Sequence, residues 1–105
     1  GGQLKVSGKT YNHSILVAPH HVMEWAHGVP LSVEDFDPLI NIIDTIDVVL
    51  VGTGATTIFL APDVKKALRE KGLHIECKDT GSACRTYNVL MAEARRVMAA
   101  LIPVS

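Results

Sequence analysis

The chain has 105 residues, which is the usual size of one compact domain, and we treat residues 1–105 as a single unit. Hydrophobic residues make up 48% of the sequence and the net charge at pH 7 is −1. This balance argues against a disordered chain, and also against a nucleic-acid binder, which needs a basic surface to neutralise phosphates. The longest apolar run, Val97–Ile102, is far shorter than the roughly 20 residues of a membrane span, so we expect no direct membrane insertion.

The first quarter of the sequence predicts short β-strands. Leu4–Val6 and Tyr11 flank Ser7-Gly8-Lys9, which is typical of a small N-terminal β-hairpin. Ser14–Ala18 is a β-rich apolar run that stops at Pro19. His21–Trp25 predicts a further short strand that places Val22 and Trp25 on buried surface.

The next segment predicts a helix followed by a central strand. Residues 32–35 have the form of an N-terminal cap, and Asp37 before Pro38 is a second capping signal. We therefore expect a helix at about 38–44, whose apolar face consists of Leu39, Ile40, Ile42 and Ile43. Asp47–Val51 has four consecutive apolar residues, which indicates a strand buried on both faces.

The second half alternates helices and strands. Pro62-Asp63 predicts the start of a helix over Val64–Lys71, which Gly72 closes. Leu73–Lys78 alternates apolar and polar residues and predicts a strand. The last helix begins near Asp79–Ser82 and carries one apolar stripe, formed by Ala83, Tyr87, Leu90, Met91 and Ala94. For residues 97–104, propensity alone leaves both helix and strand open.

This order of elements implies at least one parallel crossover, and so a layered α/β fold. The loop Gly52–Thr57 follows the central strand, where α/β proteins often hold ligands. However, Thr57 stands where a dinucleotide-binding loop has its third glycine, and no phosphate-binding lysine follows. A tight turn with close backbone packing is the alternative to a ligand loop.

A second unusual segment is residues 80–88, where Thr86, Tyr87 and Asn88 are mediocre helix formers placed early in a helix. They are consistent with capping plus a buried tyrosine, or with a polar recognition surface that presents Arg85 and Asn88. The histidines and the two cysteines, Cys77 and Cys84, lack metal-ligand spacing, so we expect no metal and no cofactor. No serine lies in a nucleophile elbow, and neither cysteine has an evident base, so we expect no catalytic residues.

Several motifs together resemble one known family of small α/β domains over about residues 6–103. They are Leu16-Val17-Ala18-Pro19, Trp25, Val48–Val51 running into Gly52-Thr53-Gly54, Glu76, Asp79-Thr80, Ala83-Cys84, Thr86-Tyr87-Asn88-Val89-Leu90, Glu93, Arg95 and Ala99–Pro103. The family includes a mitochondrial respiratory complex I assembly factor, an adipogenesis-associated protein and many uncharacterised bacterial and archaeal proteins.

The resemblance implies a three-layer α/β arrangement around a central mixed, mostly parallel sheet, in which the C-terminal segment returns as a strand. Relatives commonly have glycine where this chain has Ala94, so the end of the last helix is a point of departure. The resemblance supplies no enzymatic activity that carries over to this chain. It implies a bacterial cytoplasmic location, or the mitochondrial matrix for a eukaryotic source.

From the residues and the resemblance together we predict a non-enzymatic protein-binding domain similar to the assembly factor. Its partners would be subunits or assembly intermediates of a membrane complex. The predicted binding residues are Gly52, Thr53, Gly54, Thr80, Arg85, Thr86, Tyr87, Asn88, Glu93 and Arg95. One alternative is a small-molecule or anion-binding domain, or an unrecognised enzyme, in which Thr53, Thr80, Arg85 and Asn88 hold an anion. Another is a homo-oligomer that pairs through an exposed edge strand or helix.

Overall fold

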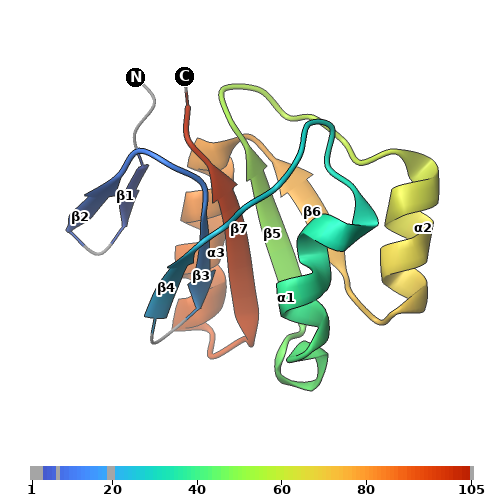
Figure 1. Cartoon of the computed structure of the whole chain (residues 1–105). Helices are drawn as coiled ribbons and strands as arrows, with labels where there is room; N and C mark the ends of the chain where they lie inside the picture. The colour runs from blue at the N-terminus through green and yellow to red at the C-terminus, as the bar shows by residue number, and fades with distance from the viewer. Residues whose placement is uncertain (1–3, 7, 19–20, 105) are drawn as a thin grey trace.

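The computed structural model describes residues 4–6, 8–18 and 21–104. The predicted turn residue Ser7 and the predicted strand stop Pro19 lie outside these ranges, as does His20. In chain order, the strands and α-helices are β1 (Leu4–Val6), β2 (Lys9–Tyr11), β3 (Ile15–Ala18), β4 (His21–Glu24), α1 (Asp37–Ile40), β5 (Val48–Thr53), α2 (Pro62–Glu70), β6 (Ile75–Lys78), α3 (Thr80–Ala92) and β7 (Val97–Ile102) (Figure 1). Two 3₁₀ turns, Val33–Phe36 and Ile43–Thr45, flank α1.

Five strands form the main sheet in the order β4-β3-β7-β5-β6, and β1 and β2 form a separate antiparallel hairpin. β5 pairs in parallel with both β6 and β7, whereas β3 runs antiparallel to β4 and β7. Four of the five strands therefore share one direction and only β3 opposes them. The predicted mixed, mostly parallel sheet, its C-terminal return strand and the N-terminal hairpin are confirmed.

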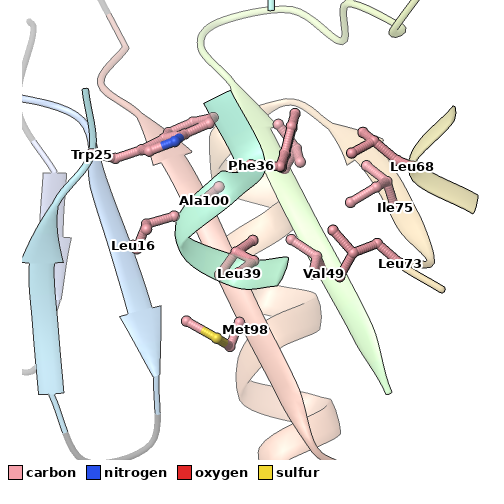
Figure 2. Close-up of a cluster of buried hydrophobic side chains, with 11 residues drawn as sticks. Leu16, Trp25, Phe36, Leu39, Val49, Leu68, Leu73, Ile75, Met98 and Ala100 are labelled. Carbon is pink, nitrogen blue, oxygen red and sulfur yellow. The ribbon is translucent and has the colours of Figure 1, made fainter. Parts of the chain in front are cut away.

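The sheet separates two apolar clusters, which gives the molecule three layers. On one face, α1 and α2 cover a cluster that includes Phe36, Leu39 and Leu68 packed on Val49 and on other strand residues (Figure 2). On the other face, α3 covers a cluster formed by the alternate strand residues, and the N-terminal hairpin adds Leu4 to it. Every residue of β5 is buried, because this strand is covered on both faces.

The predicted helix at 38–44 is wrong in its extent. Ser32 does start the turn, since its N–H donates to the Asp35 carboxylate at 2.8 Å, but helical turns then run from Val33. Asp37 is consequently the first residue of α1 and not its cap. After Ile40 the backbone hydrogen bonds span three residues, as in a 3₁₀ helix, since the Ile42 N–H donates to the Leu39 carbonyl. The Thr45 hydroxyl also donates to the Ile42 carbonyl, at 2.7 Å. Ile42 does not face the core and is 39% exposed.

The end of α3 also differs from the predicted stripe. Ala94 lies beyond the helix, with φ of 59°, the left-handed conformation that a glycine usually takes. The Arg95 N–H donates to the Leu90 carbonyl and the Ala94 N–H to the Met91 carbonyl, both at 3.0 Å. These two bonds are those of a Schellman motif, so this chain keeps a glycine-type helix end while it has alanine at the left-handed position.

Candidate functional site

The two unusual segments of the sequence meet at the carboxyl end of the central strands. The Thr80 hydroxyl donates to the Ile102 carbonyl at 2.6 Å and accepts from the Gly54 N–H at 2.8 Å. The Thr80 N–H in turn donates to the Gly54 carbonyl at 2.9 Å. Thr80 is 2% exposed. The first residue of α3 thus joins the ends of β5 and β7 from inside the molecule.

Gly52 is needed at this junction because the neighbouring backbone approaches closely. A Cβ at position 52 would lie 2.9 Å from the Thr80 Cα and 3.0 Å from the Thr80 hydroxyl oxygen. Side chains do not normally come this close, so the backbone of α3 would have to move. The first glycine of the Gly-Thr-Gly loop therefore serves packing between β5 and α3.

Thr53, between the two glycines, organises the loop that follows. Its hydroxyl accepts from the Ile58 N–H at 2.9 Å and lies 2.7 Å from the Thr56 carbonyl and 3.1 Å from the Lys78 carbonyl. One buried hydroxyl consequently fixes both the course of residues 54–58 and their position against β6. We call Gly52, Thr53, Gly54 and Thr80 together the clasp.

The structure does not bring the predicted binding residues together on one exposed surface, and their role in binding stays a prediction. The four clasp residues are buried, and their hydroxyl and amide groups are engaged with one another or with backbone groups. Arg85 and Asn88 are exposed on α3, while Thr86 and Tyr87 are partly buried. Glu93 and Arg95 lie at the far end of this helix, which has 13 residues and is therefore roughly 20 Å long.

This arrangement also bears on the alternative of anion binding. Two of its four donors, the hydroxyls of Thr53 and Thr80, already have internal partners. A third, Arg85, is exposed and donates to the Ser82 hydroxyl at 3.0 Å. The segments are in direct contact, with no cavity between Gly52 and Thr80, and this packing counts against an anion pocket formed between them.

Asp79 caps the start of α3, and its carboxylate has a lowered pKa. The Asp79 carboxylate accepts from the Ser82 N–H at 2.9 Å and from the Ser82 hydroxyl at 2.8 Å. These hydrogen bonds to the charged form lower the pKa of Asp79. Further along the helix, burial raises the pKa of Tyr87. Tyr87 is partly buried against the core on the α3 side, as a buried tyrosine would be. However, its hydroxyl makes no hydrogen bond with another described residue.

Two exposed apolar residues on the loop after β5 were missed in the sequence. Ile58 is 62% exposed and Phe59 is 77% exposed, although they are adjacent and large. The Ile58 N–H is held by the clasp residue Thr53 at 2.9 Å, so the pair emerges from an anchored loop. The signal available in the sequence was the run Ile58-Phe59-Leu60 between two threonines and Pro62, outside any predicted element. We call Ile58 and Phe59 the apolar pair.

Beside the apolar pair, two hollows follow the outer side of β6. One has a volume of about 380 Å³ and is lined by Phe59, Leu60, Pro62, Lys65, Ile75, Glu76, Cys77 and Lys78. The other has a volume of about 460 Å³ and is lined by Asp47, Val48, Lys65, Arg69, Leu73, His74, Ile75, Glu76 and Arg95. They share Lys65, Ile75 and Glu76, so together they form one groove between α2 and β6, which we call the β6 groove.

A serine–histidine pair was also absent from the sequence interpretation. The Ser14 hydroxyl lies 2.8 Å from the Nε2 atom of His27, whose Nδ1 atom lies 2.9 Å from the Gly28 carbonyl. The His27 ring also packs on Trp25 with 4.5 Å between ring centroids. The backbone N–H of Trp25 donates to the Ser14 carbonyl. Since the contacts of Ser14 with His27 and with the Trp25 backbone tie the segment after β4 to the start of β3, we interpret the pair as structural.

The two cysteines are free and lie on opposite faces of the sheet, with Cys77 packed against the α1–α2 side and Cys84 against the α3 side. Burial raises the pKa of both thiols, which lowers their thiolate fraction. The part of the chain that the structure describes holds no group of three or more His, Cys, Asp or Glu residues arranged for a metal ion. Within the same ranges, no helix has the length and apolar character needed to cross a membrane.

These features define a small three-layer α/β domain with an internal clasp, an exposed apolar pair and an edge groove. The family described as "Protein of unknown function (DUF498/DUF598)" matches residues 1–102, and the chain belongs to this family. The resemblance stated from the sequence motifs is thereby confirmed.

Similar proteins come from animals and from bacteria. The chain is 35% identical over 100 residues to "NADH dehydrogenase [ubiquinone] 1 alpha subcomplex assembly factor 3" of Danio rerio, covering 93% of this chain and 58% of that protein. It is 31% identical over 102 residues to an uncharacterized protein of Rhodobacter capsulatus, covering 97% of this chain and 78% of that protein. A crystal structure of a Bordetella parapertussis protein has 34% identity and a TM-score of 0.85, covering 97% of this chain and 88% of that one.

Proposed function

We propose that this chain is a non-enzymatic protein-binding domain that acts as an assembly factor, and that its apolar pair contacts the partner. The observation that carries the proposal is the exposure of two adjacent large apolar side chains, Ile58 at 62% and Phe59 at 77%, on a loop fixed by Thr53. Large apolar groups kept in water on an anchored loop are costly for solubility, and they contribute most when a partner buries them.

The relatives suggest which assembly process this domain would serve. The Danio rerio protein is an assembly factor of an NADH dehydrogenase subcomplex, and its similarity to this chain extends over nearly all of the domain. This supports a role in the biogenesis of a membrane respiratory complex, with subunits or assembly intermediates of that complex as partners. Because the chain spans only 58% of that relative, the remainder of the relative's activity is not carried over.

A complementation experiment in the source organism tests this proposal. The gene is deleted, and assembled respiratory complex I is measured by native gel electrophoresis with NADH dehydrogenase staining. We expect less assembled complex in the deletion strain and full recovery with the wild-type gene. The double variant Ile58→Ser/Phe59→Ser is expected to restore little, because it removes the apolar contact without altering the core.

The matched control is Val29→Ser, which removes another exposed apolar side chain, 93% exposed, outside the loop. This variant should restore assembly as well as the wild type does. Melting temperatures of all purified variants establish that each is folded. Normal complex assembly in the deletion strain would refute the role in assembly, and full recovery with the double variant would refute the role of the apolar pair.

A further inference from the structure

β6 lies at one edge of the main sheet, and within the described residues one of its two sides has no strand partner. β6 pairs with β5 alone, in the register Val49 to Ile75 and Val51 to Cys77. The Val49 N–H donates to the His74 carbonyl at 2.8 Å, which sets the direction of the backbone groups along β6. In a parallel ladder the groups alternate, so the N–H and carbonyl groups of Ile75 and Cys77 point away from β5, toward the free edge.

The free edge is not flat, because the β6 groove runs beside it. Its wall opposite β6 is formed by Lys65 and Arg69 of α2 and by Phe59, Leu60 and Pro62 of the preceding loop. β6 has four residues and is therefore roughly 13 Å long. An extended peptide of about four to six residues matches this length, and an edge strand with outward backbone groups is the surface to which such peptides add.

The charges around the groove select the chemistry of the peptide. Lys65, Arg69, Lys78 and Arg95 contribute four cationic groups, and Glu76 and Asp47 contribute two carboxylates. The Asp47 carboxylate is already neutralised, since Arg96 pairs with it at 2.7 Å. The groove therefore presents an excess of positive charge, together with apolar surface from Phe59, Leu60 and Ile75.

We propose that the β6 groove binds an extended, acidic segment of the partner protein, which adds to β6 as a further strand. The proposal rests on the protein-binding function above and names the site and chemistry of the partner segment. A second copy of this chain would present Ile75-Glu76-Cys77-Lys78, whose charges cancel, and so lacks the complementary negative charge. Glutamate or aspartate side chains of the segment pair with the four cations, while its backbone pairs with Ile75 and Cys77.

The test uses a fluorescent six-residue peptide of alternating valine and glutamate, titrated into the purified full chain. A peptide with lysine in place of glutamate is the chemical control. We expect saturable binding of the acidic peptide only, weakened by added salt. The double variant Lys65→Glu/Lys78→Glu should weaken it about tenfold. Lys66→Glu/Lys71→Glu is the matched variant, because it makes the same change in charge at two exposed lysines that do not line the groove. It should leave binding within about twofold.

Amide NMR shows where the peptide binds, and methylation of the peptide backbone shows whether it binds as an added strand. Bound acidic peptide should shift the amide signals of Ile75 and Cys77 most. Methylating the peptide N–H groups of one alternating set should abolish binding, while methylating the other set should not, because only one set faces β6. The proposal is overturned by no binding at millimolar peptide, by equal effects of the Lys66/Lys71 and Lys65/Lys78 variants, or by shifts centred on another surface.

Failure of this test would not affect the function proposed above, since the assembly role is assessed separately in the deletion strain. Conversely, a normal deletion strain with saturable peptide binding would leave the groove established and remove the assembly role.

Discussion

Thr80 is the residue whose hydroxyl group we expect to contribute most to stability. In the variant Thr80→Val the shape of the side chain is kept, but the hydroxyl is lost, and with it the bonds to the Gly54 N–H at 2.8 Å and to the Ile102 carbonyl at 2.6 Å. Each buried group left without a partner costs about 1–3 kcal/mol. With two such groups, the expected loss in the free energy of unfolding is about 2–6 kcal/mol, a large part of the roughly 5–15 kcal/mol typical of a domain.

Thr80→Ser is the matched control, because it keeps the hydroxyl and removes one methyl group, at a cost of about 1 kcal/mol. Urea unfolding followed by circular dichroism measures both variants, and an unchanged denaturant dependence would show that the unfolded state is comparable. The valine variant should also melt roughly 10–45 °C below the wild type. If valine proves no more destabilising than serine, the hydrogen bonds of the clasp are not what holds β5, β7 and α3 together.

Two further predictions concern the ends of α3. Ala94→Gly should stabilise the protein by about 0.5–1 kcal/mol in urea unfolding, because φ is 59° at this position. Ala92→Gly, inside the last helical turn, should instead destabilise the protein by about 1 kcal/mol. Equal effects of the two variants would contradict the assigned helix end. The lowered pKa of Asp79 means that its charged form stabilises the fold above the ordinary carboxyl pKa of about 3.9 and that this contribution is lost as pH falls through the lowered value. Asp79→Asn keeps a capping side chain but should flatten the stability curve below about pH 4, and an unchanged acid limb in thermal melts would disprove this.

Elements with strong local signals could be predicted from the sequence. The α2 helix has Pro62 at its start and Gly72 after its end, and Gly72 indeed has φ of 96°. The β5 strand was predicted from consecutive apolar residues, and all six of its residues are buried. In both cases the signal lies within the segment itself, so no knowledge of the neighbours is needed.

Elements that depend on their neighbours could not be predicted from propensity. The β7 segment contains methionine, two alanines and leucine, which are good helix formers, yet it is a strand between β3 and β5. Two sheet partners outweigh local preference there, and only the family resemblance indicated a strand. The α1 helix was predicted too long, since a helix expected at about 38–44 ends at Ile40. The Thr45 hydroxyl then bonds to the Ile42 carbonyl.

The topology of the sheet accounts for the meeting of the two motif segments, but the sequence does not show that their polar groups are buried. Parallel strand ends bring the Gly-Thr-Gly loop and Thr80 together, as the topology requires. However, a threonine hydroxyl bonds to backbone groups as readily as to a ligand, and the sequence does not tell which of the two it does. The apolar pair was overlooked for a related reason, because Ile58 and Phe59 look like core residues until their loop is placed.

The clasp and the two proposed contact surfaces are mechanically connected through Thr53. Its hydroxyl holds the Ile58 N–H, which belongs to the apolar pair, and lies 3.1 Å from the carbonyl of Lys78, whose residue lines the β6 groove. A partner that meets both surfaces therefore meets two parts already held in fixed relation, and it does not bear the conformational entropy cost of ordering them. On this reasoning the buried motif residues serve recognition indirectly, by positioning exposed neighbours that the partner contacts.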